Sequence, residues 1–187
     1  MPEVKKENTM KTVTWKRILR FNPYGQSIEE GTEHYGWIKA IDYWKPESLD
    51  EEVSIPMILE SNGLDDAIWT LCAFEKDHLR ELCLFKADVA ELVLHAVEEK
   101  YPKSKALRKA IEGTRLFTEG KISEEELDRR VYAAYAVAYN IRDFYGLYVS
   151  HSACETVYAV RSTNIYGHSI AEIDSKIKEI LLKYFGE

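Results

Sequence analysis

The stretch DHLRELCLFKADVAELVLHAVEEKYPKSKALRKAIEGTRLFTEG, residues 77–120, decides the fold. On both sides of Tyr101-Pro102, apolar side chains recur at intervals of three and four residues, which is the spacing of one helix face. The Tyr-Pro pair interrupts the pattern, because the residue before a proline avoids the helical region. Gly120 follows the second segment, where glycine commonly ends a helix. We therefore predict helices over residues 77–100 and 104–119.

Helical spacing continues outward from this stretch. Ser27 with Glu30, and Ser123 with Glu126, have the spacing of a capping box that opens a helix. The further predicted helices cover residues 12–21, 27–44, 55–59, 65–74, 123–146, 147–162 and 169–185. No segment alternates with period two, and VTW and LYVS are too short to be predicted as strands. The sequence predicts an all-α fold, a single-domain multi-helix bundle of about eight or nine helices over residues 12–187, after a disordered or frayed polar tail at residues 1–11.

Composition excludes several classes of protein. The chain has 187 residues, of which 45% are hydrophobic and 30% charged, so it is not a low-complexity disordered tract. No apolar run approaches the roughly 20 residues that span a bilayer, and the start MPEVKKENTM lacks the apolar core of a secretory signal. Three widely spaced cysteines do not make a disulfide scaffold, so we expect free thiols and a cytoplasmic protein.

Charge is unevenly distributed along the chain. The net charge is −7, but residues 1–20 hold six bases and two acids, and residues 26–66 hold eleven acids and two bases. Direct nucleic-acid binding is disfavoured because phosphate contacts need a basic face, and a basic protein partner suits the acidic block better. Such a block is more often only a solvated face, and acids at helix starts explain Asp65 and Asp66. The candidate partner-binding residues are Glu29, Glu30, Glu33, Asp50, Glu51, Glu52, Asp65 and Asp66.

Few residues are candidates for chemistry. His151 and Cys154 share a helix face with Glu155 nearby, which makes them weak candidates for a metal site, although a buried cysteine beside a histidine is the commoner arrangement. No phosphate-binding loop and no nucleophile motif occurs, so we expect no catalytic residue and no cofactor.

Three tyrosines on the predicted helix 123–146 form a second candidate surface. Tyr132, Tyr135 and Tyr139 have helical spacing and define an aromatic face suited to an interface, although tyrosines that pack on a neighbouring helix are the commoner arrangement.

Several segments together resemble a known family. These are LDDAIWTLCAF at residues 64–74, AELVLHAVEEKYPKSKALRKAIEGTRLFTEG at 90–120, the alanine-rich helix at 131–139 and FNPYGQSIEEGTEHYGW at 21–37. They resemble the all-helical immunity proteins of bacterial polymorphic-toxin systems, the fifth-numbered class, which have relatives in phage genomes. The resemblance is loose over residues 12–140, best over 90–120, and stops at about residue 145. Lys103 and Lys105 stand where that family often has acids, and Tyr24 where it often has cysteine.

The resemblance implies a protein that binds another protein. We expect an inhibitor that occludes a basic partner sterically and electrostatically, without membrane or direct nucleic-acid contact, and with a homodimer as one arrangement. One alternative is a phage or bacterial structural or adaptor protein that forms a homo-oligomer, with residues 131–148 as the seam. Another is a helical hydrolase that uses His151, Cys154 and Glu155.

Overall fold

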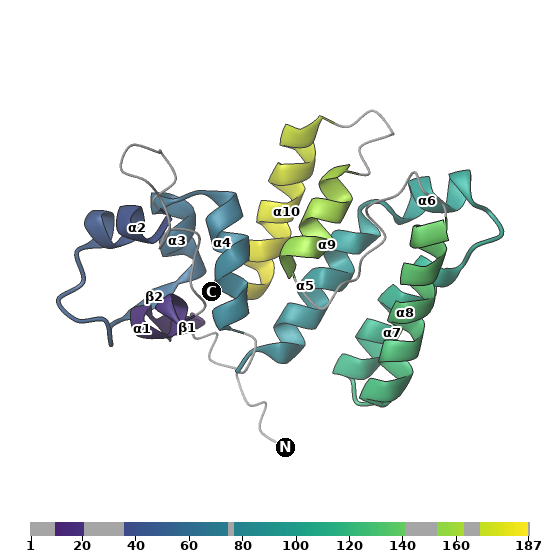
Figure 1. Cartoon of the computed structure of the whole chain (residues 1–187), viewed down its shortest axis with the longest axis horizontal. Helices are drawn as coiled ribbons and strands as arrows, with labels where there is room; N and C mark the ends of the chain where they lie inside the picture. Colours follow the sequence, from purple (N-terminus) through teal and green to yellow (C-terminus); the bar gives the residue numbers. More distant parts are fainter. Residues whose placement is uncertain (1–9, 21–35, 75–76, 141–152, 163–168, 187) are drawn as a thin grey trace, which may run out of the picture. The chain divides into compact units, whose positions relative to one another are not determined.

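The computed structural model describes residues 10–20, 36–74, 77–140, 153–162 and 169–186 (Figure 1). These residues form ten α-helices, one 3-10 helix and a two-stranded sheet, so the predicted all-α fold class is confirmed. They divide into two compact units, Met1–Ala73 with Leu182–Glu187, and Phe74–Leu181. The predicted single domain over residues 12–187 stays a prediction, and residues 1–9 of the predicted tail lie outside the described residues.

The first unit is built from short elements. They are β1 (Thr12–Thr14), α1 (Trp15–Leu19), α2 (Gly36–Trp44), β2 (Glu52–Ser54), α3 (Ile55–Ser61), α4 (Leu64–Thr70) and the 3-10 helix η1 (Leu71–Ala73). The Thr14 hydroxyl caps α1 by accepting a hydrogen bond from the Arg17 backbone N–H at 3.2 Å. Ser54 caps α3 in the same way, with Pro56 in the first turn, as its sequence predicts.

The sheet corrects the prediction that no segment near VTW forms a strand. β1 and β2 are antiparallel, with Val13 opposite Val53, and α1 continues the contact because the Lys16 N–H donates to the Leu49 carbonyl at 2.8 Å. Each strand has only three residues, which is too short to show a periodic signal in the sequence. The two strands lie 40 residues apart, and only their pairing stabilises them. Beside this sheet, Trp15, Ile18 and Ile55 are buried.

The second unit is a set of longer helices. They are α5 (Leu79–Glu91), α6 (Leu94–Lys100), α7 (Ala106–Thr118), α8 (Glu124–Asn140), α9 (Ala153–Ser162) and most of α10 (Ile170–Phe185). α5 packs against both α7 and α9, and α7 packs against α8 as a helical hairpin (Figure 1). Gly120, with φ of 71°, supplies the left-handed turn between α7 and α8, as predicted.

The predicted helix 77–100 is two helices in the structure. α5 ends at Glu91 and α6 begins at Leu94, although neither glycine nor proline lies between them. Val93 and Leu94 at this junction are both buried, so the apolar stripe continues through the break. At the other end of α5, Leu79 is 45% exposed, so the first apolar side chain of this helix does not belong to the buried stripe, although its spacing fits the stripe.

Candidate functional site

The acidic residues Asp50, Glu51 and Glu52 lie together, in β2 and the turn that leads into it. All three are exposed. Glu51 accepts a hydrogen bond from the Ser48 backbone N–H at 2.8 Å, and Glu52 accepts one from the Thr12 hydroxyl at 2.8 Å. Two of the three carboxylates therefore also hold the local structure, and all three remain in contact with water.

The described part of the basic N-terminal segment, residues 10–20, lies against these acids. β1 and α1, which follow Lys11 and carry Lys16 and Arg17, pair with residues 49–54 through the sheet and the backbone bonds of α1. Lys16 Nζ lies 3.3 Å from Asp50 Oδ1, and the two side chains are 57% and 72% exposed. Exposed pairs of this kind contribute about 0 to 1 kcal/mol, so the contact offsets charge more than it stabilises the fold. The negative potential of the acidic block is consequently weaker than its sequence suggests.

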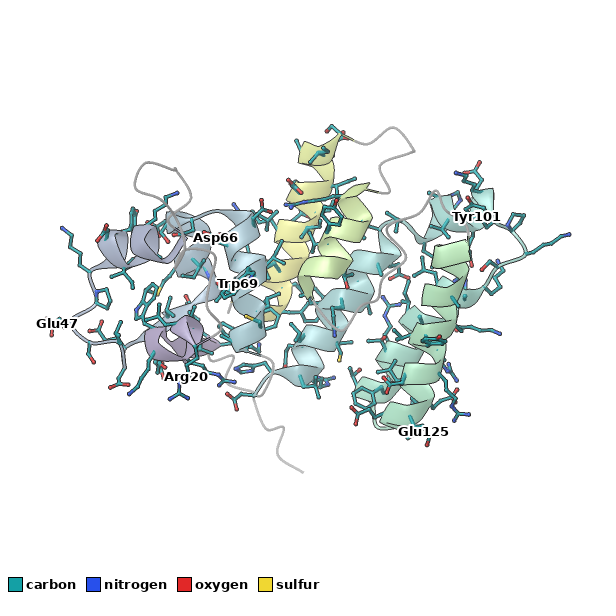
Figure 2. The ribbon with its side chains drawn as sticks, in the orientation of Figure 1. Arg20, Glu47, Asp66, Trp69, Tyr101 and Glu125 are labelled. Atoms are coloured by element: carbon teal, nitrogen blue, oxygen red, sulfur yellow. The ribbon has the colours of Figure 1, made fainter. Side chains whose placement is uncertain are left out.

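The other candidate acids occupy different places. Asp65 and Asp66 lie in the first turn of α4, where carboxylates interact favourably with the helix dipole, and Asp66 Oδ2 accepts from Asn62 Nδ2 at 2.7 Å (Figure 2). The whole of α3 separates them along the chain from the acids of β2. Glu29, Glu30 and Glu33 lie outside the described residues.

The tyrosine face is described only in part. Tyr132 in α8 is 71% exposed, while Ala134 is buried. The side chains of Tyr135 and Tyr139 lie outside the described residues. The small alanine thus accompanies the close approach of α8 to α7, and the aromatic face stays a prediction.

The side chains of the candidate metal and hydrolase residues also lie outside the described part of the structure. His151 precedes α9, and the side chains of Cys154 and Glu155 within α9 are not placed. Over the ranges that are described, no group of three or more His, Cys, Asp or Glu side chains could hold a metal ion. In the same ranges, no helix combines the length and hydropathy needed to cross a bilayer.

A basic hollow beside the α7–α8 hairpin was not predicted from the sequence. Its volume is about 1010 Å³, and its lining comes from the loop before α7 and from α7 and α8 themselves. Five cations line this basic hollow: Lys103, Lys105, Lys109, Arg129 and Arg130. The carboxylates of Glu112 and Glu126 also line it. A signal was present in the sequence, since residues 100–115 hold six bases and one acid, but the hollow exists only once α8 folds back on α7.

Ion pairs fix the helices around the basic hollow. Glu98 on α6 accepts from Arg108 Nε at 2.8 Å and from Lys105 Nζ at 3.2 Å, both from the segment that begins α7. Arg115 on α7 binds Asp88 at 2.8 Å and also pairs with Glu91, both on α5. The hydrogen bond from Arg108, reinforced by Lys105, lowers the pKa of Glu98 from 4.5 to about 2.

The pKa of Glu98 predicts an acid-dependent contribution to stability. Because its pKa is lower in the folded state, the stabilisation is fully present above pH 4.5 and is lost as the pH falls through about 2. We expect the free energy of unfolding of the wild type, measured by urea denaturation, to fall more steeply below pH 4.5 than that of a Glu98→Gln variant. Glu99→Gln is the control on the same helix. Parallel curves for the wild type and Glu98→Gln would contradict this role.

Comparison with protein families gives one match. The family described as "Imm-5 like putative immunity protein" matches residues 73–185, which is more than half of the chain. This range contains all of α5 to α10, including the C-terminal helices that the resemblance found in the sequence did not reach, and it does not include residues 12–72. Comparisons with curated proteins and with solved structures gave no match. The chain belongs to the Imm-5 like immunity protein family.

Proposed function

We propose that this protein binds a toxin-type effector protein and neutralises it by covering its functional surface. The single observation that carries the proposal is the family match over residues 73–185, because immunity proteins act by binding another protein. A helical protein with an extensive outer surface suits the role of covering a partner, and its interior side chains then serve only to hold the helices in place. Cys72 and Cys83 carry thiols and do not form disulfides, which is compatible with action in the reducing cytoplasm.

The finer part of the proposal concerns charge. The exposed acids Asp50, Glu51 and Glu52 would face a basic surface of the partner, with Glu29, Glu30, Glu33, Asp65 and Asp66 as further acids of the same segment. Opposite charges steer such an encounter and raise the association rate more than they raise the affinity. The Lys16–Asp50 pair does not prevent this, because both side chains are largely exposed and separate at little cost.

The test takes candidate toxins from the genes that neighbour the gene of this protein, and uses any product that stops cell growth when it is expressed alone. Co-expression is expected to restore growth of cells that produce the toxin, and the purified proteins are expected to form a complex by isothermal titration calorimetry. Toxicity that persists although both proteins are produced and folded would contradict the binding function.

The electrostatic part has its own test with the same pair of proteins. Neutralising the acids in an Asp50→Asn/Glu51→Gln/Glu52→Gln variant is expected to slow association about tenfold at low salt. The matched control neutralises three exposed acids of the second unit, Glu99→Gln/Asp128→Asn/Glu179→Gln. Equal effects of the two triple variants, or an association rate unchanged between low and high salt, would contradict the electrostatic mechanism while leaving binding itself intact.

A further inference from the structure

The basic hollow has a sign opposite to that of the protein as a whole. Its lining carries an excess of three positive charges, whereas the chain carries a net charge of −7. The cations come from two places in the sequence, residues 103–109 and residues 129–130, which the α7–α8 hairpin brings together. Folding therefore concentrates positive charge at one place on an acidic protein.

Much of this charge remains available to a ligand. Glu126 accepts a hydrogen bond from Arg130 Nε at 2.8 Å and forms an ion pair with Arg129 Nη2 at 3.0 Å, so one carboxylate is shared by two guanidinium groups. Lys103 and Lys109 are exposed, and within the described part of the chain neither makes an ion pair. The lysines thus provide charge that no carboxylate of the lining holds in place.

Small residues give the hollow its shape. Ala106 and Ala133 lie in the lining, and neither has a side chain larger than a methyl group. Gly113 on α7 makes room for Arg130 to lie across the hairpin, since an added Cβ there would be 2.7 Å from Arg130 Cδ. The pair with Glu126 then fixes the Arg130 side chain, which lowers the entropy lost on binding. A volume of about 1010 Å³ accommodates several side chains of a peptide.

We propose that the basic hollow binds an acidic segment of a partner protein, with glutamate or aspartate side chains among Lys103, Lys105 and Lys109. Carboxylates form charge-assisted hydrogen bonds with these ammonium groups, and the lysine stems and alanines cover the apolar part of the segment. The hollow lies within the residues that define the family, 73–185, whereas the acids of β2 lie outside them. This inference goes beyond the proposed function, because it holds whether or not the acidic block contacts a partner.

A peptide suits the hollow better than a nucleic acid does. The cations are gathered in one hollow with two carboxylates among them, and they do not form the continuous basic track that follows a phosphate backbone. The negative charge of the rest of the chain also repels a long polyphosphate more than it repels a short acidic peptide.

The test is fluorescence anisotropy of the full chain with a labelled peptide of about ten residues in which Glu and Ser alternate, at low salt. The wild type is expected to bind the peptide, and Lys103→Glu/Lys109→Glu is expected to weaken binding about tenfold. The variant is expected to fold, because both lysines are exposed and an acid in the first turn of α7 favours the helix dipole. Lys103→Ala/Lys109→Ala, which introduces no new charge, is expected to weaken binding about threefold.

The matched control is Lys176→Glu/Lys178→Glu, which makes the same charge change at two exposed positions of α10. It is expected to change the peptide affinity less than about twofold. Equal losses in the two charge-reversed variants would overturn the proposal, as would absence of peptide binding to the wild type. Tighter binding of a labelled single-stranded thymidine oligonucleotide of the same net charge would overturn it in favour of a nucleic-acid site.

Discussion

Replacing Phe85 with alanine is expected to lower the free energy of unfolding by about 3 to 5 kcal/mol. The Phe85 side chain is fully buried on α5, the helix of the second unit that packs against both α7 and α9. Removing the ring takes apolar surface out of the core and leaves a cavity that three helices cannot close without moving. Urea denaturation followed by circular dichroism measures the change, and hydrogen exchange of the α5 amides localises it.

Leu79→Ala is the control for Phe85→Ala, because Leu79 lies on the same helix and is 45% exposed. Its replacement is expected to cost less than about 1 kcal/mol. Similar losses for the two variants would show that α5 is not the core of the second unit.

Helix ends were predictable because their signals are local. The glycine after α7 lies at the residue that the sequence indicates, and the caps at Thr14 and Ser54 form bonds only within the first turns of their own helices. Ser123 also accepts from the Glu126 N–H at 3.3 Å, but the Glu126 side chain turns to Arg129 and Arg130. Each of these signals involves residues no more than four positions apart, so no knowledge of the tertiary structure is needed to recognise them.

Features that depend on distant residues were not predictable in the same way. β1 and β2 form only because Val13 meets Val53, and nothing within either triplet indicates the other. The break between α5 and α6 falls where no residue disfavours a helix, so packing on both sides, and not propensity, sets it. In both cases, the feature that was not predicted depends on contacts between residues that are far apart in the sequence.

The same distinction explains the candidate site. Summing charges along the chain indicates the acidic block, but the fold places Lys16 against Asp50 and the basic segment beside β2. In the second unit, Lys109 and Arg130 are 21 positions apart and become neighbours only in the α7–α8 hairpin. The charge of a segment in the sequence therefore indicates the sign of the folded surface only where that segment does not pack against a segment of opposite charge.

The two charged surfaces lead to separable expectations for a partner. A partner that uses only the acids of β2 loses association rate in the carboxylate-neutralised triple variant and is unaffected by Lys103→Glu/Lys109→Glu. A partner that inserts an acidic segment into the basic hollow shows the reverse. Salt weakens both kinds of contact, so the variants, and not ionic strength, distinguish them.

Gly113→Leu is expected to lower the free energy of unfolding by about 1 to 3 kcal/mol. Gly113 is buried in the middle of α7 where α8 crosses it, and even an added Cβ would lie 2.7 Å from Arg130 Cδ. The larger leucine side chain must push α8 away or force Arg130 off Glu126, and either change loosens the hairpin that forms the basic hollow. The gain of about 1 kcal/mol from replacing a glycine within a helix offsets only part of this cost.

Gly113→Ala separates the gain from replacing a glycine within a helix from the steric cost of the larger leucine side chain. A single methyl group meets only the flexible middle of the Arg130 side chain, which can turn aside, and the helix gains about 1 kcal/mol from alanine. Its stability is therefore expected to stay within about 1 kcal/mol of the wild type by urea denaturation.

In the Gly113→Leu variant, the acidic peptide is also expected to bind more weakly, because Arg130 no longer lines the basic hollow in its original position. A leucine variant that is as stable as the wild type and binds the peptide equally well would show that α7 and α8 do not depend on this close approach.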